Sequence, residues 1–65
     1  MKLIVNGETQ EAKCTTLANL LDALDYDVDW LATAVNGELV HSEERAIHAL
    51  AEGDRVEILS PMQGG

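Results

Sequence analysis

The sequence predicts an α+β fold, with a mixed sheet of four to five strands, one main helix on one face of the sheet and a flexible C-terminal Gly-Gly tail. Three observations lead to this prediction. Asn-Gly pairs interrupt two alternating apolar runs, leucines recur at helical spacing in one segment, and a last alternating run ends shortly before a proline. The 65 residues suffice for one domain. We expect it over residues 1–60, with the tail over residues 61–65.

The first hairpin is predicted at the beginning of the chain. The run KLIVN (2–6) alternates and is rich in branched side chains, which is typical of a strand. The pair Asn6-Gly7 follows and favours a type I′ turn, because both central residues of that turn need a positive φ. The polar run ETQEAK (8–13) then predicts a returning strand at an edge of the sheet.

The main helix is predicted in the segment LANLLDAL. Thr15 or Thr16 precedes it, and either hydroxyl can cap a helix by accepting from an otherwise unpaired backbone N–H. The leucines have i, i+3, i+4 and i+7 spacing, which predicts one apolar face packed on the core. They are Leu17, Leu20, Leu21 and Leu24. The polar segment DYDVD (25–29) ends the pattern and predicts a loop.

A second hairpin is predicted over residues 31–40, where Asn36-Gly37 separates an alternating run from a short return strand. The string VNGE therefore occurs twice, at 5–8 and at 35–38. The residues around the two copies differ, so we interpret the repetition as shared turn chemistry and not as a repeat architecture.

The last part of the chain predicts a short helical turn and a final strand. SEERAIHAL (42–50) opens with a capping residue and an acidic first turn, and RVEIL (55–59) alternates. Pro61 lacks a backbone N–H, so the strand should not continue past Ser60. If the final strand lies beside the first, it runs parallel to it in the middle of the sheet. This is the β-grasp arrangement of ubiquitin-like proteins.

Composition excludes several classes of partner and compartment. The formal net charge of −8 argues against nucleic acids and anionic membrane surfaces, and it suits a partner with a basic docking face. No apolar run is long enough to span a bilayer. The start MKLIVNGE turns polar too soon for a signal peptide, and a small domain with one cysteine fits a reducing compartment. We therefore expect a cytoplasmic protein.

Few side chains suggest catalysis or metal binding. Cys14, His41 and His48 lack the spacing of a metal site or of a nucleophile and its base, and no glycine-rich loop predicts phosphate binding. We expect Cys14 to be a small, buried or half-buried side chain and Trp30 to be a partly buried cap on the core. So small a chain favours a carrier, adaptor or subunit over an independent enzyme.

The terminal stretch SPMQGG offers a different chemistry, because its C-terminal carboxylate can be activated by another enzyme. Gly64 and Gly65 carry no side chains, so they can enter a narrow nucleotide site and leave the terminal carbonyl carbon open to attack. Six extended residues reach roughly 20 Å, which is enough to enter a cleft while the folded body docks outside. We expect Met62 and Gln63 to contact the same partner.

Several segments together resemble the ThiS family, the sulfur carriers of thiamine biosynthesis. They are KLIVNGE, TLANLLDAL, AVNGELV, EGDRVEIL and the terminal QGG. The resemblance covers the whole chain, and its most specific part is the Gly-Gly end joined to a Gly-Asp turn and a final strand. Gly64 matches the neighbouring glycine of the family motif.

The resemblance implies a function and a set of partners. An E1-like adenylating enzyme (ThiF-like) uses ATP to adenylate the carboxylate of Gly65. A sulfur donor system such as a cysteine desulfurase converts the adenylate to a thiocarboxylate, and thiazole synthase (ThiG-like) receives the sulfur. The chain is then a carrier protein and a co-substrate, not an enzyme, with no bound cofactor.

Two alternatives stay open. The small subunit of molybdopterin synthase (MoaD-like) shares the fold, the Gly-Gly tail and the activation chemistry, as do other Gly-Gly carriers, but MoaD-like chains are typically longer. A β-grasp binding module with an incidental Gly-Gly end belongs to another functional class. Removing Gly65 distinguishes the two classes, because a binding module does not need its C-terminal carboxylate.

Alternation also predicts a docking surface on the uncovered face of the sheet. The helix is expected to cover the side chains of Leu3, Val5, Val35, Val56 and Ile58. Ile4, Ala34 and Leu59 then point to the opposite face, where we expect them to form one apolar row leading toward the tail. Such a row within an acidic surface suits an activating enzyme with a basic docking face.

Overall fold

The computed structural model describes residues 1–26, 29 and 31–59 of the chain. The first hairpin contains β1 (Lys2–Val5) and β2 (Glu8–Glu11), and it is followed by helix α1 (Leu17–Ala23). The second hairpin contains β3 (Ala32–Val35) and β4 (Glu38–Val40). A short 3₁₀ helix, η2 (Ser42–Glu44), and strand β5 (Arg55–Leu59) follow. The elements occur in the order that the sequence predicts.

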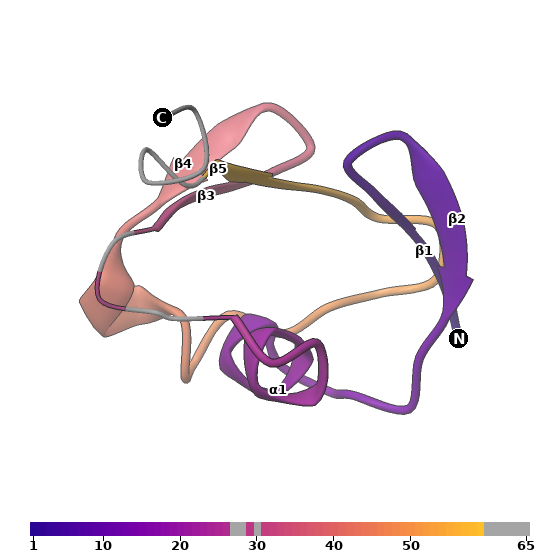
Figure 1. Ribbon diagram of the computed structural model, residues 1–65, viewed down its shortest axis with the longest axis horizontal. Helices are drawn as coiled ribbons and strands as arrows, with labels where there is room; N and C mark the ends of the chain where they lie inside the picture. The colour runs from indigo at the N-terminus through magenta and orange to yellow at the C-terminus, as the bar shows by residue number, and fades with distance from the viewer. Residues whose placement is uncertain (27–28, 30, 60–65) are drawn as a thin grey trace.

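The strands form one mixed sheet in the order β2-β1-β5-β3-β4. Strand β5 lies between the two hairpins, parallel to β1 and antiparallel to β3. The sheet forms one layer and α1 lies across one of its faces (Figure 1). This is the ubiquitin-like β-grasp fold expected from the sequence, with β2 at one edge and β4 at the other.

The two Asn-Gly pairs form the predicted turns. The φ angles are 51° and 83° at Asn6 and Gly7, and 52° and 84° at Asn36 and Gly37. All four residues therefore have the left-handed backbone conformation of a type I′ turn, which Asn and Gly adopt more readily than other residues. Each turn brings its two strands back antiparallel, which sets the register of each hairpin.

Helix α1 begins at a threonine cap. The hydroxyl oxygen of Thr16 accepts a hydrogen bond of 3.2 Å from the backbone N–H of Asn19, which satisfies one of the free donors of the first turn. Leu17, Leu20 and Leu21 are buried, as the leucine spacing predicts. Leu24 is the C-terminal cap and is only partly buried, because the helix ends at Ala23.

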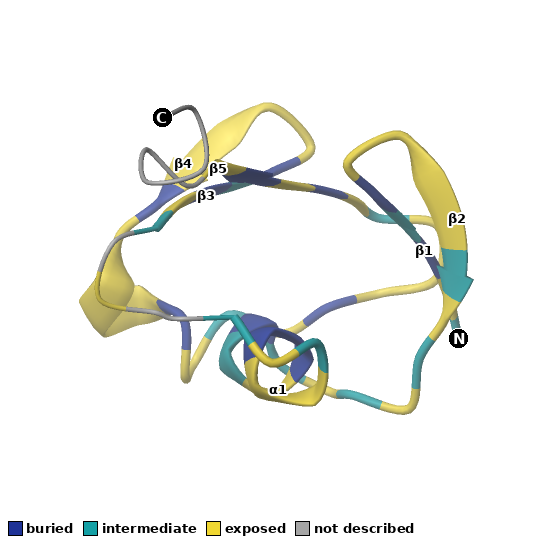
Figure 2. Ribbon diagram, in the orientation of Figure 1, coloured by how far each residue is buried: buried dark blue, intermediate teal, exposed yellow. Residues whose placement is uncertain are grey.

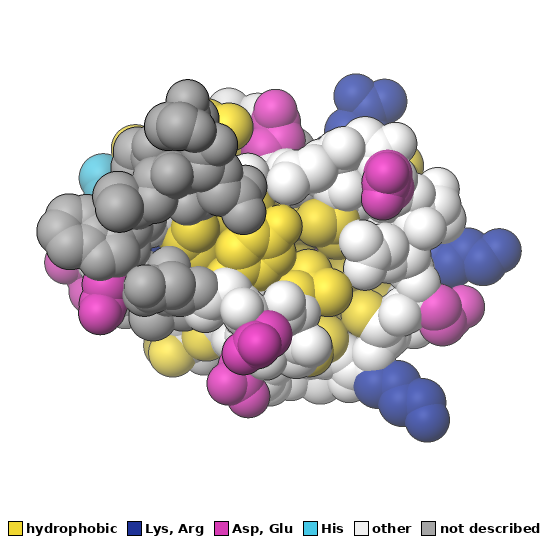
Figure 3. Space-filling model, viewed as in Figure 1, with side chains coloured by type: hydrophobic (Ala, Val, Ile, Leu, Met, Phe, Trp, Pro, Cys, Tyr) yellow, Lys and Arg dark blue, Asp and Glu magenta, His cyan; other side chains and the backbone are white. Residues whose placement is uncertain are grey.

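The core lies between α1 and the sheet, and it contains the side chains that alternation assigns to the covered face. Leu3, Val5, Val35, Val56 and Ile58 are all buried. Figure 2 shows the buried positions along β1, β5 and the sheet-facing side of α1, whereas β2 is largely exposed. In the space-filling view, hydrophobic side chains gather between the two layers with carboxylates around them (Figure 3).

The connection from β4 to β5 contains the predicted helical turn. The turn covers only Ser42–Glu44, whereas the segment that predicts it runs over residues 42–50. Its first residues are held by Glu44, whose carboxylate accepts from the backbone N–H of His41 at 3.3 Å. The backbone N–H of Glu44 donates in return to the carbonyl oxygen of His41 at 2.9 Å. Within the part of the chain that the structure describes, no helix is long and apolar enough to cross a membrane.

Candidate functional site

The candidate site is the C-terminal segment together with the strand from which it continues. Gly65, Gly64, Gln63 and Met62 lie outside the described residues, as does Trp30. Strand β5 is described through Leu59, and residues 60–65 follow it directly in the chain. The surroundings of β5 therefore define the part of the fold from which the segment continues.

Strand β5 is the central strand of the sheet and is bonded on both sides. On the β1 side, the backbone N–H of Ile4 donates to the carbonyl oxygen of Asp54 at 2.9 Å. On the β3 side, the backbone N–H of Asn36 donates to the carbonyl oxygen of Arg55 at 2.8 Å. The side chain of Val56, the second residue of β5, is fully buried in the core. A central strand with partners on both sides gives the C-terminal segment a fixed starting point.

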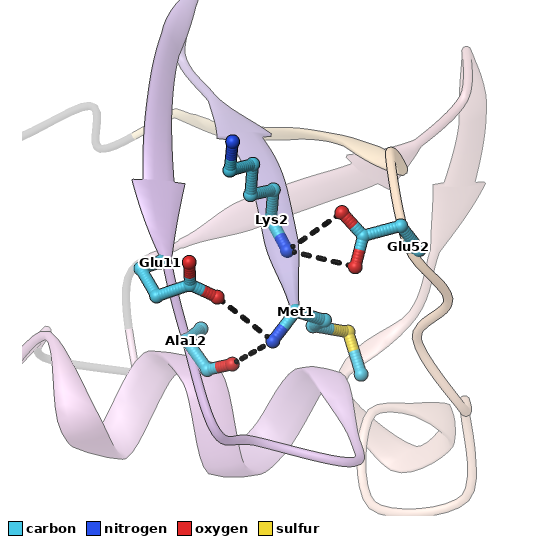
Figure 4. Close-up of polar contacts among 5 residues, drawn as sticks. All are labelled: Met1, Lys2, Glu11, Ala12 and Glu52. Carbon is cyan, nitrogen blue, oxygen red and sulfur yellow. Dashed lines mark hydrogen bonds and ion pairs between the residues drawn. The ribbon is translucent and has the colours of Figure 1, made fainter.

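The loop before β5 is tied to the start of β1 (Figure 4). The backbone N–H of Lys2 donates to both carboxylate oxygens of Glu52, at 3.1 and 3.0 Å. The backbone N–H of Gly53 donates to the carbonyl oxygen of Lys2 at 2.7 Å. Beside this contact the amino group of Met1 pairs with the Glu11 carboxylate at 3.0 Å. The bonds of Glu52 and Gly53 to Lys2 fix the start of β5 against the first strand, and the Met1–Glu11 pair joins the first strand to β2.

Both turn asparagines bond to β5 through their side chains, a role that the turn chemistry alone does not reveal. The Oδ1 atom of Asn6 accepts from the backbone N–H of Ile58 at 2.8 Å. The Oδ1 atom of Asn36 accepts from the backbone N–H of Arg55 at 3.0 Å. The recurrence of VNGE, with Asn at the same turn position each time, is the sequence signal for this shared role.

The three predicted docking residues lie on the sheet face opposite α1, but they do not form one row. Ile4 is level with Arg55 at the beginning of β5, whereas Leu59 is level with Ala32 at its end. Ala34 is level with Glu57, between them. The prediction of a single apolar row is therefore wrong. The parallel register of β1 and β5 places Ile4 beside the first residue of β5, and the charged side chains of Arg55 and Glu57 separate it from Leu59.

A smaller apolar surface does form at the end of β5. We call it the outer patch, and it consists of Ala32, Ala34, Leu39 and Leu59. Strand pairing explains it, because Ala32 lies opposite Leu59 and Ala34 lies opposite Leu39. Leu59 is 67% exposed and Leu39 is 62% exposed. The patch contains two of the three predicted docking residues, and Ile4 lies apart from it.

Ala32 and Leu39 are the members of the outer patch that the sequence prediction missed, and Leu39 is the larger of the two. The sequence signal for Leu39 is the alternation along β4, which buries Val40 and turns Leu39 to the opposite face. A shallow hollow at the patch also includes Glu57, so a carboxylate borders the apolar surface. An apolar centre with a charged border is typical of a protein-docking surface.

The described residues contain no cluster suited to a metal ion, since no three His, Cys, Asp or Glu side chains come together in ranges 1–26, 29 and 31–59. Cys14 is a free thiol and is partly buried, as expected. The chemistry that the sequence predicts lies at the C-terminal carboxylate, outside the described residues.

The comparisons with known proteins agree on one family. The model of the ThiS family matches residues 3–65 of the chain. The crystal structure of the thiamine biosynthesis protein ThiS from Geobacter metallireducens is similar, with a TM-score of 0.85, 30% sequence identity and full coverage of both chains. An NMR solution structure of a thiamine biosynthesis protein from the same organism has a TM-score of 0.80 and 30% identity, covering 100% of this chain and 88% of that one. Among curated proteins, none matches the chain.

Proposed function

The chain belongs to the ThiS family of sulfur carriers in thiamine biosynthesis, and we propose that it carries sulfur as a thiocarboxylate on its C-terminal residue, Gly65. The observation that carries this proposal is that the family match runs through residue 65 and so includes both glycines of the tail. The fold supports it, because the tail continues from the central strand of the sheet.

The proposed chemistry begins with activation of a poor electrophile. The Gly65 carboxylate attacks the α-phosphate of ATP in a ThiF-like enzyme, which forms an acyl-adenylate and releases pyrophosphate. A persulfide sulfur from a donor system such as a cysteine desulfurase then attacks the acyl carbon and displaces AMP. A thiol then attacks the donor's sulfur in the resulting acyl disulfide, which releases the thiocarboxylate and leaves a disulfide between that thiol and the donor. The chain supplies the carboxylate and acts as a co-substrate, while its partners supply the catalytic groups.

The acceptor of the sulfur in this proposal is a thiazole synthase, a ThiG-like enzyme of the cytoplasm. Gly64 leaves room beside the reacting carbon, and Met62 and Gln63 contact the same partner cleft. The outer patch and the negative net charge favour a partner with an apolar contact surrounded by basic side chains. Two enzymes must use the same carboxylate in turn, so each complex has to dissociate before the other forms.

The experiment that tests this function is ATP–pyrophosphate exchange catalysed by the ThiF-like enzyme of the same organism. Exchange should depend on this chain and should be lost when the carboxylate of Gly65 is amidated. The amidated protein keeps every other atom of the fold, so it is the matched control for a folding defect. Exchange that proceeds equally well with the amidated protein would exclude the proposed adenylation.

A further inference from the structure

Asn6 bonds to β5 at two points on either side of Glu57. Its backbone N–H donates to the carbonyl oxygen of Val56 at 2.9 Å. Its side-chain oxygen accepts from the backbone N–H of Ile58 at 2.8 Å. The partner in the second bond is a backbone donor, so only the oxygen of the amide can face it. Asn6 thus extends the contact between the first hairpin and β5 beyond the last residue of β1, Val5.

The side-chain bond replaces a backbone bond that the turn removes. Paired residues of β1 and β5 are Ile4 with Arg55 and Val5 with Val56, and the pairing ends there because the chain turns at Asn6. Ile58 is only 5% exposed, so its N–H has little access to water. Without the Asn6 oxygen, this donor would lose its partner in a partly buried place, which is unfavourable.

Asn36 provides a natural comparison, because it has the same turn conformation and bonds to the same strand. Its side-chain oxygen accepts from Arg55 at the first residue of β5, and its amide nitrogen also donates to the Asp54 carboxylate at 3.0 Å. The two asparagines therefore hold opposite ends of one strand. Asn6 bonds near the end that continues into residues 60–65, and Asn36 bonds at the far end.

We propose that Asn6 is a positioning residue for activation of the tail. Its side chain holds the end of β5 on the β1 side, so that the C-terminal segment continues from a fixed strand end. This inference rests on the proposed function, because it concerns delivery of the Gly65 carboxylate to the activating enzyme. Asn6 acts through Ile58 and does not touch the reacting atoms.

The expected kinetic signature follows from conformational entropy. When the Asn6 bond is lost, Ile58 and Leu59 are held only on the β3 side, by their pairing with Thr33 and Ala32. The additional backbone motion must be given up when the segment enters the activating enzyme. The loss therefore weakens binding of the carrier and raises its KM. Once bound, the carboxylate occupies the same site, so kcat should stay nearly unchanged.

The test compares three variants in ATP–pyrophosphate exchange with the ThiF-like enzyme. Asn6→Gly removes the acceptor while tolerating the positive φ, and Asn6→Asp keeps an acceptor oxygen at the same position. Asn36→Gly makes the matching change at the other turn and removes one more hydrogen bond. We expect KM to rise about 3–10-fold for Asn6→Gly, as partial loss of one hydrogen bond would give. Asn6→Asp and Asn36→Gly should stay within about 2-fold of the unchanged protein.

The outcomes separate this inference from the proposed function. If Asn36→Gly raises KM as much as Asn6→Gly, the effect is general destabilisation and the positioning role is wrong, although the sulfur-carrier function stands. A fall in kcat at constant KM would also overturn it. If the unchanged protein supports no exchange, the proposed function fails and the inference fails with it.

Amide hydrogen exchange gives a second measurement that does not depend on a folded Asn6→Gly variant. In the unchanged protein the Ile58 amide should exchange slowly, as a bonded N–H does. In Asn6→Gly, protection should fall at Ile58 and persist at Val56. Exchange of the Ile58 amide at an unprotected rate in the unchanged protein would overturn the proposal even if the variant does not fold.

Discussion

The Nε atom of Arg45 donates a hydrogen bond of 3.1 Å to the hydroxyl oxygen of Thr33 inside the fold. Both residues are buried, with exposed fractions of 5% for Arg45 and 1% for Thr33. The Thr33 hydroxyl donates in turn to the carbonyl oxygen of Val40 at 2.8 Å. A terminal nitrogen of Arg45 donates to the carbonyl oxygen of Leu31, also at 2.8 Å. One arginine therefore joins the segment after β4 to β3 and to the residue that precedes β3.

The first prediction concerns this arginine. Arg45→Met should lower the free energy of unfolding by about 1.5–3 kcal/mol, because buried hydrogen bonds from a charged donor are lost. Arg45→Lys should restore little of the stability, since an ammonium group lacks the planar set of donors that reaches two oxygens at once. Urea unfolding measures both changes.

The control is Arg55→Met, which removes an exposed arginine from the face opposite α1. Its effect on the free energy of unfolding should be within about 0.5 kcal/mol. A loss at Arg45 no larger than the loss at Arg55 would show that the buried hydrogen bonds add no net stability.

The second prediction concerns the turn glycine Gly37. An added Cβ would meet nothing within 4 Å, so a change to alanine brings no clash. The φ of +84° is nevertheless unfavourable for a residue with a Cβ. Gly37→Ala should therefore lower the free energy of unfolding by about 1–2 kcal/mol. Gly37→Asn should lose less, because Asn tolerates this conformation better. Equal losses in urea unfolding would contradict the backbone explanation.

The third prediction concerns the cap of α1. Thr16→Ala removes the acceptor for the Asn19 backbone N–H and should cost about 1 kcal/mol. Thr15→Ala is the matched control. The Thr15 hydroxyl accepts only a side-chain bond of 3.4 Å from Asn19 at an exposed position. Thermal unfolding should show a clearly lower midpoint for Thr16→Ala alone, and similar midpoints would assign the cap to neither threonine.

The fourth prediction concerns the docking surface. Leu59→Glu and Ala34→Glu should weaken binding to the activating enzyme, because each places a carboxylate in the outer patch. The side chain of Leu59 is largely exposed, so that variant should keep its stability. Ile4→Glu tests whether the surface extends to the beginning of β5, where Ile4 is level with Arg55. Raising the salt concentration should slow association with a basic partner.

The control for the docking surface is Ile47→Glu, which changes an apolar side chain that is 81% exposed outside the outer patch. Its association rate, measured by stopped flow, should match that of the unchanged protein. If all the patch variants fold and associate normally, the activating enzyme docks elsewhere. If they unfold instead, the assignment of these residues to the uncovered face is wrong.

The elements of the fold were predictable because their signals are local. The leucine spacing of α1 depends on residues within two turns, and each type I′ turn depends on one Asn-Gly pair. The covered face followed from alternation along each strand, which the burial of Val56 and Ile58 confirms. The central place of β5 followed from the fold that this order of elements favours.

The failures of sequence prediction arise where distant segments meet. The row of Ile4, Ala34 and Leu59 required the register between β1 and β5, two strands about 50 positions apart, and alternation does not contain that register. The burial of Arg45 was equally hidden, because its partners come from β3 and from the residue before it. The Asn6 side-chain bond to Ile58 depends on the same long-range packing.

The central claim is that sulfur is carried on the carboxylate of Gly65, and intact mass spectrometry tests it most directly. The protein is incubated with the ThiF-like enzyme, ATP and a sulfur donor system, beside a variant with one additional residue after Gly65. The unextended protein should gain the mass difference between one sulfur and one oxygen atom, and the extended variant should keep its mass. An unchanged mass for the unextended protein would contradict the claim, as would equal conversion of the extended variant.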